Sequence, residues 1–154
     1  MNHWLLKTEP SSFGIEHLQA AARHTASWDG VRNFQARNMI RDRIKKGDQA
    51  FLYHSSCERP GIAGIVRVVR GAYPDASALD RRDPRYDAIG SAAQPRWYAF
   101  DVRLARRFAR VIGLDELRAH AKGALEGLLI LRAGNRLSVT PVDDAHWRFI
   151  LSLE

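Results

Sequence analysis

Short apolar runs recur along this chain, and in one segment apolar and polar residues alternate; this pattern predicts a protein rich in β-structure. Five apolar or alternating runs have the length and composition of strands: residues 3–8, 50–54, 61–73, 96–110 and 137–142. Gly64 lies within a run rich in Ile and Val. A residue without a side chain at that place predicts a bulge or a close approach of two backbones.

Apolar residues at helical spacing predict short helices between and after these strands. One is expected from residue 15 to about residue 23, and another from residue 35 to the turn at Lys46-Gly47-Asp48. Two more are expected over residues 114–121 and after Asp143, which stands in the position of a helix cap.

A long polar segment, residues 74–95, separates two of the predicted strands. It carries three prolines, several acidic and basic residues, and little periodicity. It is longer than an ordinary connection between elements. It is therefore expected to be either an ordered functional loop or a mobile flap.

Strands separated by short helices predict the α+β fold class. We expect a mixed, strongly curved β-sheet or barrel with short helices at its periphery. A length of 154 residues is typical of one domain with one core, so residues 1–154 are expected to form a single domain. Trp4 and Trp147 lie at apolar positions of their elements and are expected in the core.

Basic residues outnumber acidic residues by 24 to 17, which gives a formal net charge of +7 and a pI near 10.2. A hydrophobic content of 45% and a charged content of 27% are those of a folded protein. The positive charge favours an acidic partner, most simply nucleic acid. The alternative is a basic surface that only keeps the protein in solution.

Cys57 is the only cysteine, so the chain has no internal disulfide and no multi-cysteine metal site. The first residues lack the features of a signal peptide, and no segment approaches the roughly 20 apolar residues of a membrane span. We therefore expect a cytoplasmic protein away from membranes. We expect neither metal nor cofactor, because ligand clusters and a phosphate-binding glycine loop are both lacking.

The stretch from Trp28 to Asn38 carries the strongest candidate chemistry. It places an indole beside an acid, a glycine, a guanidinium and several amides. The indole offers a flat apolar face, the acid and amides can read donors and acceptors, and Arg32 suits a phosphate. These residues predict a pocket for a single nucleobase with Trp28 as a wall. The alternative is that Trp28 is only a core residue.

Six segments, in order along nearly the whole chain, resemble the EVE domain family. They are Trp4-Leu5-Leu6-Lys7-Thr8-Glu9-Pro10, Trp28-Asp29-Gly30-Val31-Arg32-Asn33, Tyr53-His54-Ser55-Ser56-Cys57, Pro60-Gly61-Ile62-Ala63-Gly64, Arg96-Trp97-Tyr98 and Gly134-Asn135-Arg136-Leu137-Ser138-Val139. Thr8 stands where the family more often has serine, but it keeps the hydroxyl.

The resemblance implies a PUA-like β-barrel that binds a modified base, for example a methylated one, in DNA or RNA. The EVE domain is itself similar to the YTH domain, which holds a methylated base of RNA in an aromatic cage. By position, Trp28 would be one wall of such a cage and Trp97 a second. The base pocket is then expected to contain Trp28, Asp29, Asn33, Gln35, Asn38, Tyr53, His54, Ser55 and Trp97. Phosphate contacts are expected from Lys7, Arg32, Arg37, Arg132 and Arg136.

Two other classes of function stay open. Related barrels include amidohydrolases of modified nucleosides that use a Lys, a Thr and a Glu, which points to Lys7, Thr8 and Glu9. Alternation along a strand would send Lys7 and Glu9 to the side opposite Thr8, and we assign no catalytic residue. A protein-interaction or small-molecule-sensing module is the third reading. The expected partner is nucleic acid carrying a modified base, bound by a monomer, with a weak dimer as the alternative.

Overall fold

The computed structural model describes residues 1–154 and is built on one six-stranded sheet in the order β2-β5-β4-β3-β1-β6. The strands are β1 (His3–Thr8), β2 (Thr25–Trp28), β3 (Gln49–His54), β4 (Gly61–Pro74), β5 (Tyr98–Gly113) and β6 (Val139–Val142). β1 and β3 run parallel, whereas every other pair of neighbours is antiparallel. The predicted α+β class with a curved, mixed sheet is confirmed.

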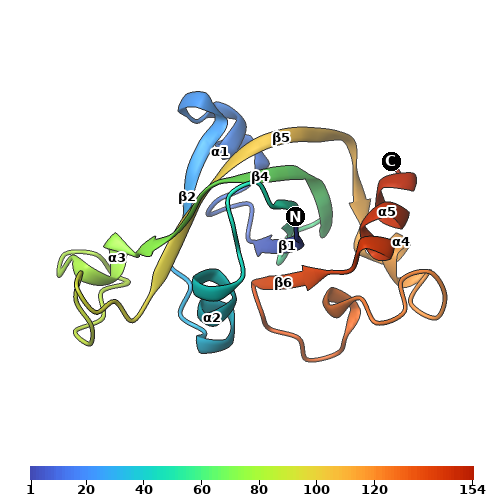
Figure 1. Ribbon diagram of the computed structural model, residues 1–154. Helices are drawn as coiled ribbons and strands as arrows, with labels where there is room; N and C mark the ends of the chain where they lie inside the picture. Colours follow the sequence, from blue (N-terminus) through green and yellow to red (C-terminus); the bar gives the residue numbers. More distant parts are fainter.

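Short helices surround the sheet, as Figure 1 shows. They are α1 (Ile15–Ala20), α2 (Phe34–Asp42), α3 (Ala76–Leu79), α4 (Leu114–Arg118) and α5 (Asp144–Ser152), with 3₁₀ turns η1 (Ala22–His24) and η2 (Leu129–Leu131). α3 belongs to a loop that projects from one end of the molecule, and α4 and α5 lie at the other end (Figure 1). No helix is long and apolar enough to cross a bilayer.

β4 and β5 arch across the molecule and give the sheet its curvature (Figure 1). Their register shifts next to Gly64, where a side chain would collide with the carbonyl oxygen of Arg106. Only glycine allows two backbones to come this close. The prediction of a bulge and a close approach at Gly64 is therefore confirmed.

Side chains on the two faces of the sheet pack into two separate apolar clusters. The first core receives residues from all six strands and from α1 and α2, and it contains Trp4, Leu6 and Trp28. The second core lies under α4 and α5 and contains Leu5, Tyr53 and Trp147. Because β1 is buried on both faces, its side chains alternate between the two cores.

Two differences from the sequence prediction go beyond a shift of a few residues at the end of an element. Residues 25–28 form the edge strand β2 against β5, although a segment of only four residues that includes Ala26 and Ser27 carries little strand signal. α2 ends at Asp42 instead of continuing to Lys46-Gly47. The turn that replaces the end of the predicted helix is held by Asp48, whose buried carboxylate accepts 3.0 Å hydrogen bonds from the backbone N–H groups of Lys45 and Asn2 and from the indole N–H of Trp4.

Asp48 thus joins the turn after α2 to the start of β1, and replacing it tests this connection. Asp48→Ala leaves three donors without their acceptor, and we expect a loss of about 2–4 kcal/mol in the free energy of unfolding. Denaturant unfolding followed by circular dichroism measures it. The fully exposed Asp115→Ala serves as the control and is expected to change stability by less than about 0.5 kcal/mol. Equal stability of the two variants would contradict the role of Asp48.

Candidate functional site

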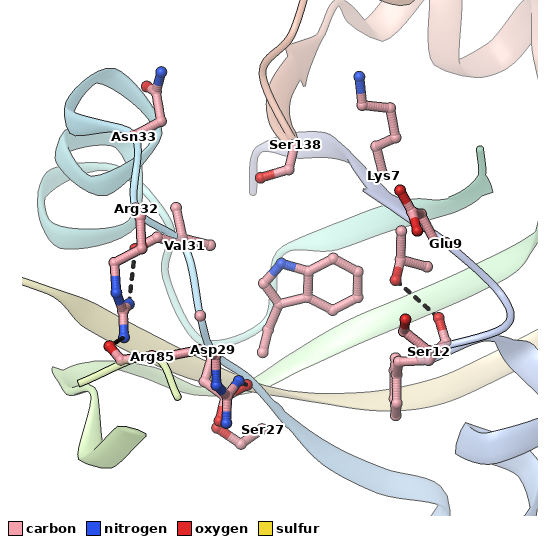
Figure 2. A pocket seen from close by; sticks show the side chains of 14 residues that line it. Lys7, Glu9, Ser12, Ser27, Asp29, Val31, Arg32, Asn33, Arg85 and Ser138 are labelled. Carbon is pink, nitrogen blue, oxygen red and sulfur yellow. Dashed lines mark hydrogen bonds and ion pairs between the residues drawn. The ribbon is translucent and has the colours of Figure 1, made fainter. Parts of the chain in front are cut away.

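A cavity of about 570 Å³ opens at the ends of β1 and β2. It is lined by four parts of the chain: residues 7–13, residues 27–33, Arg85 and Ser138. Figure 2 shows Lys7, Glu9 and Ser12 on one side, with Asp29, Arg32 and Asn33 opposite. β2 and β6 are the two edges of the sheet, so the cavity lies where the curved sheet brings its edges together.

Trp28 ends β2 and forms part of both the first core and the cavity wall. Its ring packs edge-on against Phe13, with 6.1 Å between ring centroids, and lies 6.4 Å from the ring of Phe100. Its side chain is 7% exposed. Its indole N–H donates to no group of the chain. Every buried side-chain polar atom of the protein has a hydrogen-bond partner, so this N–H without a partner is not buried and is open to the cavity. The indole is therefore held in place without being sealed.

The loop that follows Trp28 is held by a carboxylate from a distant part of the chain. Asp75 is buried and accepts hydrogen bonds from the backbone N–H of Gly30 at 2.8 Å and from Nη1 of Arg32 at 3.0 Å. Ser77 donates to the same carboxylate through its backbone N–H, at 2.9 Å, and its hydroxyl. Gly30 has φ +77°, a conformation that side chains disfavour, which explains a glycine at this turn.

The charge state of Asp75 follows from these contacts. Burial by itself would raise the pKa of the Asp75 carboxyl, but the hydrogen bonds from Ser77, Gly30 and Arg32 outweigh it and lower the pKa below its ordinary value. Because the pKa is lower in the folded chain, the carboxylate contributes stability above the unfolded value of about 3.9. This contribution is lost as the pH falls through the lowered pKa, so the loop is fully held at neutral pH.

The polar segment 74–95 supplies a second clamp at the rim of the cavity. Nη1 of Arg85 donates to the Asp29 carboxylate at 2.7 Å. Nη2 of Arg32 in turn donates to the carbonyl oxygen of Arg85 at 2.9 Å, an interaction drawn in Figure 2. The segment is thus tied to the residues that follow Trp28 and contributes Arg85 to the cavity wall.

Three of the nine expected base-pocket residues line this cavity: Trp28, Asp29 and Asn33. The side-chain oxygen of Asn33 accepts a hydrogen bond from the backbone N–H of Ala36 at 3.0 Å and so caps α2. Its amide N–H groups stay available because the oxygen is used for the cap. Asn33 therefore presents a donor at the cavity.

Trp97 lies elsewhere, and the expectation that it forms a second cage wall needs correction. Its ring is 5% exposed and stacks on Phe34 at 4.9 Å, and its N–H donates to Asp87 at 2.6 Å. The guanidinium groups of Arg32 and Arg37 lie within 6 Å of its ring centre. The residue anchors the segment 74–95 and does not line the cavity.

Three residues at the end of β3 are also away from the cavity. Tyr53 points into the second core, because alternation places it on the opposite face of the sheet from Trp28, and burial raises the pKa of its hydroxyl. Nε2 of His54 accepts from the backbone N–H of Ile15 at 3.2 Å, and the Ser55 hydroxyl donates to the carbonyl oxygen of Thr8 at 3.3 Å. These residues brace α1 and β1.

The last two expected pocket residues lie on α2. Gln35 lines a neighbouring cavity, and the side-chain oxygen of Asn38 accepts from Nε of Arg37 at 2.8 Å. Both are exposed on the surface of the helix. Asn38 therefore faces away from a ligand in the cavity beside Trp28.

The five expected phosphate ligands divide into two groups. Arg32 is committed to Asp75 and Ser77, and Nη1 of Arg37 donates to the carbonyl oxygen of Arg96 at 2.7 Å, so both have structural roles. Lys7 lines the cavity, whereas Arg132 and Arg136 line the neighbouring one. None of these three forms an ion pair with an acidic residue. They are the cations that remain free near the site.

Sequence reasoning did not assign several residues to the site, among them Ser12, Phe13, Arg85 and Ser138 in the cavity wall and Asp75 behind it. Phe13, Asp75 and Arg85 come close to Trp28 only through the fold, and no local pattern singles them out. The alternative set of Lys7, Thr8 and Glu9 lines the same cavity, although the Thr8 hydroxyl is engaged with the carbonyl oxygen of Phe13 at 2.8 Å. No group of three or more His, Cys, Asp or Glu side chains is placed to hold a metal ion.

The sequence matches the EVE domain family over residues 2–153. Relatives include thymocyte nuclear protein 1 of Gallus gallus, 43% identical over 99% of this chain and 68% of that protein. The human protein of the same name is 40% identical over 99% of this chain and 74% of its own length. These matches extend over nearly the whole chain.

Solved structures agree with the sequence match. Human THYN1, crystallised in complex with DNA containing 5-methylcytosine, superposes with a TM-score of 0.92 at 39% identity, over 99% of this chain and 97% of that one. A Pseudomonas syringae protein gives 0.90 at 44% identity over 98% of both chains. The YTH domain of Zygosaccharomyces rouxii MRB1 gives 0.53 at 14% identity, covering 99% of this chain and 83% of that one, and shows a shared fold.

The names of the relatives correct the expected location. The relatives from chicken, rat and human are named as nuclear proteins, which contradicts a cytoplasmic assignment. The expectation rested on a single free cysteine and the lack of a signal peptide. Both features suit any reducing compartment, so they do not distinguish the cytoplasm from the nucleus.

The contact between Asp75 and the loop after Trp28 gives a test of the site's construction. Asp75→Ala removes the shared acceptor of Gly30 and Arg32, and we expect a loss of about 1–3 kcal/mol in stability. Amide hydrogen exchange should show faster exchange at residues 29–33, with β3 unchanged. Asp80→Ala, which removes a partly exposed carboxylate in the same segment, is the control. Unchanged protection of residues 29–33 in Asp75→Ala would rule out this clamp.

Proposed function

The chain belongs to the EVE domain family, and we propose that it binds DNA through one modified base, of the 5-methylcytosine class, held beside Trp28. The observation that carries the proposal is an indole fixed by Phe13 and Phe100 and still open to a cavity of about 570 Å³. The complex of human THYN1 with DNA containing 5-methylcytosine supports the choice of ligand.

The energetics of such a site depend on how many aromatic walls it has. Extruding a base from a duplex costs a few kcal/mol, and stacking on one aromatic side chain returns roughly 1–3 kcal/mol. Trp97 lies outside the cavity, so the aromatic side chains in its wall are Trp28 and Phe13, and Trp28 is the one indole. Stacking at best offsets extrusion, and the net affinity must come from hydrogen bonds to the base edge and contacts with phosphates.

Polar groups that are free of internal partners determine which base edge fits. The Asp29 carboxylate is held by Arg85, whereas Glu9 forms no ion pair and lines the cavity. Lys7, the amide group of Asn33 and the indole N–H of Trp28 supply donors. A free carboxylate accepts hydrogen bonds only, and cytosine presents an exocyclic amine that donates. Glu9 is therefore assigned to that amine.

The methyl group of the modified base contributes little binding energy by itself. Burying one such group contributes about 0.8 kcal/mol, which is roughly a fourfold change in affinity. Discrimination between methylated and plain cytosine therefore depends also on the shape of the cavity. A modest preference is expected.

The alternative function is an amidohydrolase acting on modified nucleosides. Lys7, Thr8 and Glu9 do line the cavity together, but none of the relatives described above is named as an enzyme. Incubation with 5-methyl-2′-deoxycytidine separates the two proposals. Turnover that disappears in Lys7→Ala would favour the enzyme.

Removing the indole tests the proposed function directly. Trp28→Ala is expected to weaken binding of a short oligonucleotide with one 5-methylcytosine by about 5- to 150-fold, because stacking contributes roughly 1–3 kcal/mol. Fluorescence anisotropy of the labelled oligonucleotide measures the affinity. Tyr86→Ala removes an aromatic side chain from an exposed residue outside the cavity, and it should change binding by less than about twofold. Equal binding by folded Trp28→Ala and the wild type would remove Trp28 from the site.

Thymine provides a test of Glu9, because it keeps the methyl group and replaces the amine with a carbonyl oxygen. The wild type should prefer 5-methylcytosine over thymine at the same position by about 5- to 150-fold, the cost of leaving a polar group unpaired. Glu9→Gln should narrow this preference, because an amide can donate to the carbonyl. Competition binding gives both ratios, with the exposed and remote Glu58→Gln as control. A preference unaffected by Glu9→Gln would exclude Glu9 from base recognition.

A further inference from the structure

A second cavity of about 540 Å³ adjoins the one beside Trp28. Asn33 lines both cavities, and the consecutive residues Leu137 and Ser138 line one each. The two cavities therefore form neighbouring compartments of one surface. Asn33 and the residues that lead into β6 lie between them. A ligand chain that leaves the first compartment on this side enters the second.

The second cavity combines an apolar floor with positive charge. Met39, Leu129 and Leu137 provide the apolar part, and Arg132 and Arg136 the charge. No acidic residue lines the cavity, and neither arginine forms an ion pair. Both side chains are exposed. Their guanidinium groups are thus free for an anion.

The arginines of β5 show that this freedom is not general in the protein. Arg106, Arg107 and Arg110 pair with Glu154, Glu16 and Glu116 respectively. An arginine that already has a carboxylate partner neutralises a phosphate less well than a free one does. The strongest unpaired positive charge beside the candidate site is therefore at Arg132 and Arg136.

The turn that carries the two arginines is fixed before any ligand binds. The Asn135 amide donates to the carbonyl oxygen of Leu129 at 2.8 Å, and its side-chain oxygen accepts from the backbone N–H of Leu137 at 3.0 Å. Gly134 has φ +78° within this turn. A turn that is ordered in advance lowers the cost of ordering on binding.

We propose that the second cavity binds the nucleotide next to the modified base, on one side of it only. Arg132 and Arg136 hold its phosphate, and Met39 and Leu129 contact its sugar or base. The ligand is then a dinucleotide step that crosses Asn33, with one base in each compartment. This inference rests on the proposed function and specifies its ligand.

Two dinucleotides test the sidedness of this arrangement. One carries 5-methylcytosine at its 5′ end and the other at its 3′ end, and each competes against a labelled eight-nucleotide single strand with one 5-methylcytosine. The wild type should bind one dinucleotide at least about fivefold more tightly than the other. The double variant Arg132→Ala/Arg136→Ala should abolish this difference. Equal competition by both dinucleotides, or by neither, overturns the proposal.

Salt dependence gives a second readout of the same two residues. If each arginine neutralises one phosphate, the double variant should reduce the slope of log affinity against log salt by about 1.4 for a single strand. Arg59→Ala/Arg148→Ala removes the same charge from exposed arginines outside both cavities and should leave the slope unchanged. A double variant at Arg132 and Arg136 that matches this control in slope and affinity overturns the inference.

The two proposals fail in different ways. Arg132→Ala/Arg136→Ala should weaken methylated and plain strands equally, because phosphate contacts carry no base information. Trp28→Ala should instead weaken binding of the methylated strand and leave the slope against salt unchanged, because the indole contacts the base and no phosphate. If folded Trp28→Ala binds that strand as tightly as the wild type does, the proposed function fails. A loss of affinity in Trp28→Ala together with no effect of the arginine variants removes only the second compartment.

Discussion

The buried carboxylate of Asp75 is the constraint on which the candidate site depends. It joins the loop after β4 to the loop after β2, which are 45 residues apart, by accepting hydrogen bonds from Gly30 and Arg32. A buried charge is tolerated only when donors surround it, and here Ser77 completes the set. The loop after Trp28 is not paired with a strand, so the Asp75 carboxylate holds it through hydrogen bonds instead. The backbone that carries Asp29 and Asn33 is held by this contact.

The same contact decides which basic residues can meet a ligand. Arg32 pairs with Asp75, Arg37 donates to a carbonyl oxygen, and three of the four arginines of β5 pair with glutamates. A net charge of +7 is thus spread over a surface on which most guanidinium groups already have partners. A basic residue without an internal partner is better placed to neutralise a phosphate and so release counterions from DNA. Total charge favours nucleic acid as a partner, but local pairing determines where it binds.

Sequence pattern predicted the parts of this protein that depend on neighbours in the chain. Apolar runs located β1, β3 and β4, alternation located β5, and apolar placement identified Trp4 and Trp147 as core residues. It did not separate Trp28 from Trp97, because both stand beside polar residues at the end of a strand. The difference comes from Asp87 and Phe34, which cover Trp97 from other segments. The position of Tyr53 could have been predicted, because alternation along β3 places its side chain on the face of the sheet opposite the first core.

A cavity with one indole in its wall must recognise a modified base differently from an aromatic cage. Two or three rings can enclose a methyl group and exclude water, so shape alone selects the modified base. One ring holds any base by its face, since every base has a π-surface. Identity must then be read from the edge, where Glu9 and the Asn33 amide offer an acceptor and donors. A base bound against these groups displaces their water, so a group that the wrong base leaves unpaired loses a hydrogen bond to water and gains none in return. Selectivity in such a site therefore comes more from the polar groups that the wrong base leaves unpaired than from the hydrogen bonds that the right base makes.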